Sequence, residues 1–87
     1  MKLTTKGRYA VMAMADLALF KDRGPTSLKD ISLRQNISEA YLEQIFIKLK
    51  HSNLVKSVRG AKGGYILQLS PEDINISNII SAVDEEI

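Results

Sequence analysis

A helical pattern and a glycine-rich hairpin follow each other directly in residues 38–67, SEAYLEQIFIKLKHSNLVKSVRGAKGGYIL. Apolar residues at i, i+3, i+4 and i+7 predict a helix over residues 39–51, whose buried stripe is Leu42, Ile45, Phe46 and Leu49. Ser38 stands in front of it as an N-cap. The β-prone runs VKSV and YILQL flank RGAKGG and predict a hairpin over residues 55–69, with a loop that glycine permits.

A second helix is predicted just before this stretch, over residues 28–35, with Ser27 as its N-cap. Only about three residues connect it to the helix at 39–51. Two helices joined by so short a turn are typical of a helix-turn-helix, and a basic hairpin directly afterwards indicates the winged variant. Helices are also expected over residues 5–20 and 77–87. The predicted fold class is therefore mainly α with a small β-hairpin, a winged helix-turn-helix.

Length and composition limit what this domain can do. Its 87 residues predict one domain, 1–87, with no room for a deep substrate cavity. The chain has no cysteine and a single histidine, His51, so we expect no disulfide, no metal site and no cofactor within it. No nucleophile–base pair stands at a recognisable spacing. We therefore expect neither an enzyme nor a small-molecule substrate.

Charge is distributed unevenly along the chain. All twelve lysines and arginines but only five of the ten acids lie in residues 1–69, and the other five acids lie in residues 70–87. A basic body favours a polyanionic partner, double-stranded DNA, although small domains also vary in charge without such a reason. The N-terminus resembles a signal peptide, but Asp16 interrupts its apolar run and no cleavage site follows. No apolar run is long enough to span a membrane, so a cytoplasmic protein is expected.

The DNA contacts are expected on two elements, the hairpin and the helix at 39–51. Arg59 suits the negative potential of a narrow minor groove and Lys62 suits phosphate, while Gly60 gives the loop clearance. With Leu42 pointing inward, the outward face of the helix holds Ala40, Glu43, Gln44, Ile47 and Lys48, with Tyr41 on its flank.

Base-specific contacts are expected from the middle of this face. Gln44 can pair with adenine, and Glu43 can accept a hydrogen bond from cytosine N4. Glu43 could instead be solvated or pair with a nearby base such as Arg59. At the start of the first helix, phosphate contacts are predicted from Lys6, Arg8 and Tyr9.

The first helix is apolar on nearly every face, in the run GRYAVMAMADLALF. Such a helix is normally covered on more than one side. Two explanations remain open: a partner subunit covers it, or its small alanines fill a crowded core.

Four segments, KLTTKGRYAVMAMADLAL, ISEAYLEQIFIKLK, LVKSVRGAKGGYIL and IISAVDE, resemble the IscR-like members of the bacterial Rrf-type winged-helix transcription regulators. The resemblance covers essentially the whole chain. It implies a dimeric regulator whose third helix enters the major groove and whose wing enters the minor groove. The implied DNA contacts are Tyr9, Ser38, Ala40, Tyr41, Glu43, Gln44, Arg59 and Gly60.

The resemblance also raises the question of an iron–sulfur cluster. In cluster-binding relatives, cysteine ligands and a long dimerisation helix follow the AVDE segment. A cluster would therefore require that the protein continue past Ile87 with such ligands. Two other hypotheses stay open: a DNA-binding half separated from a sensing and dimerisation segment, and a winged-helix module that binds protein instead of DNA.

Overall fold

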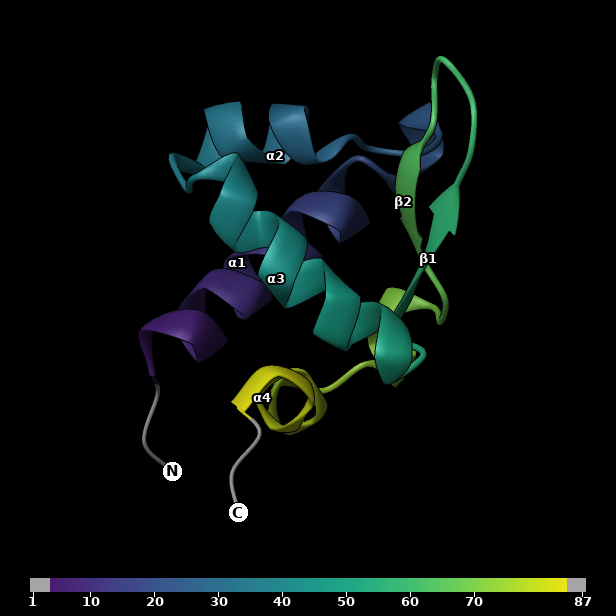
Figure 1. Cartoon of the computed structure of the whole chain (residues 1–87). Helices are drawn as coiled ribbons and strands as arrows, with labels where there is room; N and C mark the ends of the chain where they lie inside the picture. Colours follow the sequence, from purple (N-terminus) through teal and green to yellow (C-terminus); the bar gives the residue numbers. More distant parts are fainter. Residues whose placement is uncertain (1–3, 85–87) are drawn as a thin grey trace.

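The computed structural model describes residues 4–84 of the chain. The helices pack together on one side of the domain, and a two-stranded antiparallel hairpin projects on the other side (Figure 1). The elements in chain order are α1 (Thr5–Leu19), a 3₁₀ turn (Lys21–Arg23), α2 (Leu28–Gln35), α3 (Glu39–His51), β1 (Val55–Val58), β2 (Gly64–Leu67), a second 3₁₀ turn (Pro71–Asp73) and α4 (Ile76–Asp84). This is the predicted winged helix-turn-helix architecture.

Each α-helix begins after a polar side chain that accepts a hydrogen bond from the backbone N–H three residues on. The donor–acceptor distances lie between 2.9 and 3.1 Å, and the acceptors are Thr4, Ser27, Ser38 and Asn75. These bonds satisfy N–H groups that have no partner inside the helix. The bounds of α2 and α3 therefore coincide with the ranges expected from the sequence.

The outer helices differ slightly from expectation. The first was expected to reach residue 20, but it ends at Leu19 because Phe20 leaves helical geometry at φ −109° and ψ 18°. The last was expected to begin at residue 77, but Asn75 is its cap and α4 begins at Ile76. The expected continuation over residues 85–87 lies outside the described residues.

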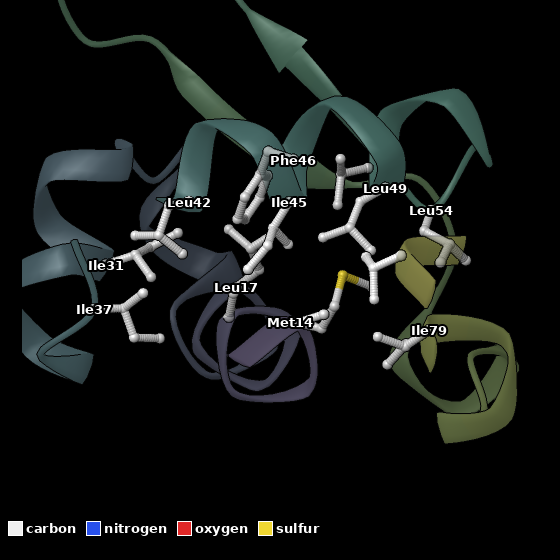
Figure 2. Close-up of a cluster of buried hydrophobic side chains, with 14 residues drawn as sticks. Met14, Leu17, Ile31, Ile37, Leu42, Ile45, Phe46, Leu49, Leu54 and Ile79 are labelled. Carbon is white, nitrogen blue, oxygen red and sulfur yellow. The ribbon is translucent and has the colours of Figure 1, made fainter. Parts of the chain in front are cut away.

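The core lies between α1, α2, α3 and α4 (Figure 2). The predicted stripe of α3 is buried there, with Leu42, Ile45, Phe46 and Leu49 all fully inaccessible to solvent. The side chains of Met14 and Leu17 from α1 face that stripe (Figure 2). Because the stripe points inward, the opposite face of α3 is left open to solvent.

Small residues on α1 allow close approach of its neighbours. Gly7, Ala10 and Ala13 are buried, and a β-carbon added at Gly7 would lie 3.6 Å from the side chain of Ile80 on α4. This packing fits the explanation that alanines fill a crowded core. Leu19, at the end of α1, is nevertheless 77% exposed.

The hairpin is in regular register, with Val55 opposite Leu67 and Val58 opposite Gly64. The second strand is shorter than the expected run to residue 69, since it ends at Leu67. The N–H of Gln68 still donates to the carbonyl oxygen of Leu54 at 2.9 Å, and the chain then turns.

Candidate nucleic-acid interface

The turn between α2 and α3 is tight and specific. Asn36 ends α2 in the left-handed conformation, at φ 57° and ψ 47°, which asparagine tolerates better than most residues. Ile37 is buried and anchors the turn to the core, and Ser38 then caps α3. Three residues therefore suffice to join the two helices, and α3 starts at a fixed place relative to α2.

The outward face of α3 is exposed as predicted. Tyr41 and Lys48 are half-buried at its edges. The exposed residues of the face are Ser38, Ala40, Glu43, Gln44 and Ile47. It thus offers an amide, a carboxylate and two small residues near the first two turns, from which recognition helices make most of their base contacts.

The tip of the hairpin carries the predicted cations. Arg59, Gly60 and Lys62 are all exposed. Gly60 has φ +117°, a conformation that residues with a side chain rarely adopt, and its carbonyl oxygen accepts from the N–H of Gly63 at 3.0 Å. Glycine therefore closes the loop, which projects from the helices at the end of the hairpin (Figure 1).

The base of the hairpin is attached to the rest of the domain at Tyr65. Its N–H donates to the carbonyl oxygen of Thr26 at 2.8 Å, and the N–H of Thr26 donates back at 3.0 Å. The Tyr65 ring packs on Phe46 of α3, with ring centroids 4.7 Å apart. The wing is therefore fixed both to α3 and to the segment before α2. The sequence analysis missed this contact, because an isolated pairing residue such as Thr26 has no periodic pattern.

The start of α1 lies beside the start of α3. The rings of Tyr9 and Tyr41 meet edge to face, with centroids 5.5 Å apart and planes at 75°. Arg8 is exposed, with its guanidinium 5.9 Å from the Tyr9 ring centroid, and Lys6 is half-buried. The structure thus brings Tyr9 of α1 next to Tyr41 of α3, whereas Arg59 and Lys62 lie on the separate wing.

An ion pair between the buried Asp16 and the partly exposed Arg34 joins α1 to α2. The Asp16 side chain is fully buried and accepts from the Arg34 guanidinium at 2.7 and 3.0 Å and from the Gln35 amide at 3.0 Å. The guanidinium also stacks on the Phe20 ring, 4.1 Å from its centroid. Burial alone would raise the pKa of Asp16, but the hydrogen bonds from Arg34 and Gln35 and the guanidinium charge hold it below its ordinary value.

This cluster was not anticipated, because Asp16 had been interpreted only as an interruption of the apolar run. Its partners lie 18 and 19 residues further on, at the end of α2. The ion pair therefore fixes the helix that leads into the turn. An acidic residue within an otherwise apolar helix could have indicated this ion pair from the sequence, because a buried carboxylate needs a cation partner.

Glu43 does not pair with Arg59. Within residues 4–84, the ion pairs join Lys21 to Asp22 and Arg34 to Asp16. Glu43 is exposed on the outward face of α3. Of the alternatives considered for this acid, the intramolecular ion pair with Arg59 is excluded.

The described residues of this chain do not form an iron site. The chain has no cysteine. Within the described residues, no three of its histidine and acidic side chains come close enough to hold a metal ion.

No helix in the described part of the chain has the length and apolar character needed to cross a membrane.

A helix-turn-helix followed by a two-stranded wing, with polar and basic side chains exposed on both, defines the class of winged-helix domains. The chain belongs to the Rrf2 family, described as iron-dependent transcriptional regulators, whose family model matches residues 3–87. This membership places it among transcriptional regulators and not among enzymes.

Named relatives agree with this assignment. The chain is 59% identical over 87 residues to the HTH-type transcriptional regulator IscR of Aliivibrio salmonicida and 54% identical to IscR of Escherichia coli. These matches cover 100% of this chain but only 52% and 54% of those proteins. The chain thus spans about half the length of the curated relatives it matches.

Solved structures give the same result for the fold. IscR of T. potens superposes with a TM-score of 0.89 at 53% identity, covering 95% of this chain and 61% of that one. CymR, the global cysteine regulator of B. subtilis, superposes with a TM-score of 0.93 at 46% identity, covering 100% and 67%. The winged helix-turn-helix and the resemblance to IscR-like regulators are confirmed.

Proposed function

We propose that this chain is a sequence-specific double-stranded DNA-binding regulator of transcription, which acts in the cytoplasm as a repressor by occupying a promoter. The observation that carries the proposal is the arrangement of two exposed elements, the outward face of α3 and the wing tip. Tyr65 attaches the wing to both α3 and Thr26, so the two elements keep a fixed spacing. A fixed spacing is what simultaneous contact with neighbouring grooves requires.

In this proposal α3 enters the major groove and supplies base contacts. Gln44 pairs with adenine and Glu43 accepts from cytosine N4, both from an exposed helix face. Ser38 and Ala40 are small and allow close approach to the bases. Tyr41 lies at the edge of the face, where its hydroxyl reaches phosphate.

The wing enters the minor groove, where the guanidinium of Arg59 meets the strong negative potential of a narrow A·T-rich segment. Gly60 keeps the loop thin, and Lys62 neutralises phosphate. Further phosphate contacts come from Lys6, Arg8 and Tyr9 on α1 and from Lys48 on α3, which gives affinity without sequence preference.

The full-length protein is proposed to act as a homodimer. Two copies related by two-fold symmetry would bind a pseudo-palindrome with half-sites about one helical turn apart, or a multiple of it. An iron–sulfur cluster, if the protein uses one, would need cysteine ligands from beyond Ile87.

The test is a binding titration on a pool of random-sequence duplexes at two salt concentrations, followed by sequencing of the bound fraction. Binding that weakens with salt and enriches a two-fold-related motif is expected. A half-site without symmetry would assign this chain to the DNA-binding half of a larger regulator. No binding at low salt, together with capture of a protein partner that resists nuclease, would replace the proposal by a protein-interaction module.

A further inference from the structure

A large apolar side chain, Ile47, lies in the middle of the polar outward face of α3. It is 67% exposed. It follows Glu43 by four residues and Gln44 by three, so the three side chains share one face of the helix. Single exposed apolar residues are common on protein surfaces. This one lies inside the surface proposed to bind DNA, and the inference rests on that proposed function.

Two lysines, Lys48 and Lys50, lie near Ile47 on α3. Ile47 lines an open depression of about 940 Å³ along α3, together with Gln44, Lys48, His51 and other residues, including Tyr65 from the wing. Ile47 is the one branched aliphatic side chain in that lining. The charge of the two lysines favours a polyanion as the ligand, and the side chain of Ile47 favours one that also offers a small apolar group.

The major groove offers such a group, the C5 methyl of thymine. Residues three apart are separated by about 4.5 Å along a helix axis. Successive base pairs are separated by about 3.4 Å. A helix that lies along the groove with Gln44 on one base pair therefore brings Ile47 close to the next. We infer that Ile47 contacts the C5 methyl of a thymine adjacent to the base pair that Gln44 contacts.

The contact can be tested by removing one methyl group from the DNA. Replacing thymine by deoxyuridine changes nothing else on the major-groove edge. In the tightest duplex from the selection, each thymine is replaced singly. Wild-type binding is expected to weaken about fourfold at one position in each half-site, the equivalent of one buried methyl group. In Ile47→Ala this loss disappears.

A matched control is available on α4. Ile76 is 57% exposed and lies away from the outward face of α3, in a groove between α1 and α4. Ile76→Ala makes the same chemical change and is expected to keep the whole deoxyuridine penalty. Alanine has a higher helix propensity than isoleucine, so Ile47→Ala should remain folded at this exposed position, which circular dichroism checks.

The outcomes separate the inference from the proposed function. Equal losses for wild type and Ile47→Ala at every thymine would overturn the inference and leave DNA binding intact. A changed mass in sedimentation, with an unchanged deoxyuridine profile, would assign Ile47 to a protein contact and also overturn it. Failure of the wild-type protein to bind any duplex would overturn the proposed function itself.

Discussion

Two arginines of this chain occupy opposite environments. Arg59 is exposed at the wing tip, where only the backbone turn constrains it. Arg34 holds the buried carboxylate of Asp16 and stacks on Phe20. The first is proposed to act on DNA, and the second stabilises the fold that presents α3. Substitution of Arg59 should therefore change the affinity for DNA, and substitution of Arg34 should change the stability of the fold.

Replacing Arg59 by alanine should weaken DNA binding by about 1–3 kcal/mol at sites with a narrow, A·T-rich minor groove. The loss arises because a guanidinium inserted into such a groove responds to its enhanced negative potential. Titrations on A·T-rich and G·C-rich duplexes of equal length give the comparison. An equal loss of affinity on both duplexes would show that Arg59 contacts phosphate and does not distinguish the width of the minor groove.

Replacing Glu43 by alanine should broaden the base preference at one position, because the free-energy difference between the preferred base and the others falls by roughly 1–3 kcal/mol. An acid close to DNA disfavours bases without a donor, so its removal takes away a penalty as well as a contact. Sequencing of selected sites measures the change. Glu39→Ala, another exposed acid on the same helix, is the control and should leave the selected motif unchanged.

The ion pair between Asp16 and Arg34 predicts an asymmetry in stability. Arg34→Ala leaves the carboxylate of Asp16 buried without its cation and should cost about 3–5 kcal/mol in the free energy of unfolding. Asp16→Ala leaves a guanidinium that is already partly exposed and can turn into water, so about 1.5–3 kcal/mol is expected. Urea unfolding of both variants measures the difference. Equal losses would show that water reaches Asp16 readily.

The same pair predicts how stability depends on pH. The pKa of Asp16 is lowered in the folded protein, so the unfolded chain takes up this proton first as the pH falls. The contribution of the carboxylate is therefore complete well above pH about 4 and is lost below that value. The stability gap between wild type and Asp16→Asn should shrink between neutral pH and pH about 3. A stability difference that stays constant over this pH range would contradict an ionised Asp16 carboxylate in the folded protein.

At the scale of single residues, the sequence was informative where a pattern is local. The caps Ser27 and Ser38 follow from short-range rules, and the structure confirms both. Asp16 could not be understood in this way, since its partners are on another helix and a helical pattern contains no information on which element will pack beside it.

At the scale of the element, two of the three glycines of the wing have different roles. Gly60 has φ +117° and open space around it, whereas Gly64 has φ +152° and a β-carbon there would also clash with the carbonyl oxygen of Thr26. Gly60 allows the backbone to turn, and Gly64 allows the backbone of β2 to come close to that of Thr26. The two positions should therefore respond differently to the same substitution.

Gly60→Ala should cost about 1–3 kcal/mol through its backbone conformation alone. Gly64→Ala should cost more, because the Thr26–Tyr65 pairing must also separate to make room. Denaturant unfolding compares the two, and amide hydrogen exchange at Tyr65 reports on the pairing itself. Retained slow exchange at Tyr65 in Gly64→Ala would contradict this account of the wing base.

Elements were easier to predict than the contacts between them. The spacing of Leu42, Ile45, Phe46 and Leu49 determined both the bounds of α3 and its outward face. The same spacing could not show that Phe46 packs on Tyr65, since periodicity describes one helix at a time. The hairpin was found from its glycines, but its attachment to Thr26 depends on backbone atoms that every residue has.

At the scale of the whole molecule, the uneven charge distribution makes affinity depend on salt. Lys62→Gln removes one proposed phosphate contact and should reduce the slope of log K against log salt by about 0.9. Glu72→Gln, in the acidic C-terminal part of the chain, is the control and should leave the slope unchanged. Titrations over a range of salt concentrations give both slopes. Equal changes in the two variants would show that net charge alone sets affinity.

The attachment of the wing at Tyr65 has a practical consequence for protein engineering. The loop of residues 59–63 is joined to the domain only through strands whose positions are set below it, by Thr26 and Phe46. Loops on such rigid supports tolerate replacement. The loop can therefore be exchanged for others of different length or charge while α3 is kept. With α3 in the major groove and the wing in the minor groove, as proposed, such chimeras would share one major-groove specificity and differ in the minor-groove sequences they prefer.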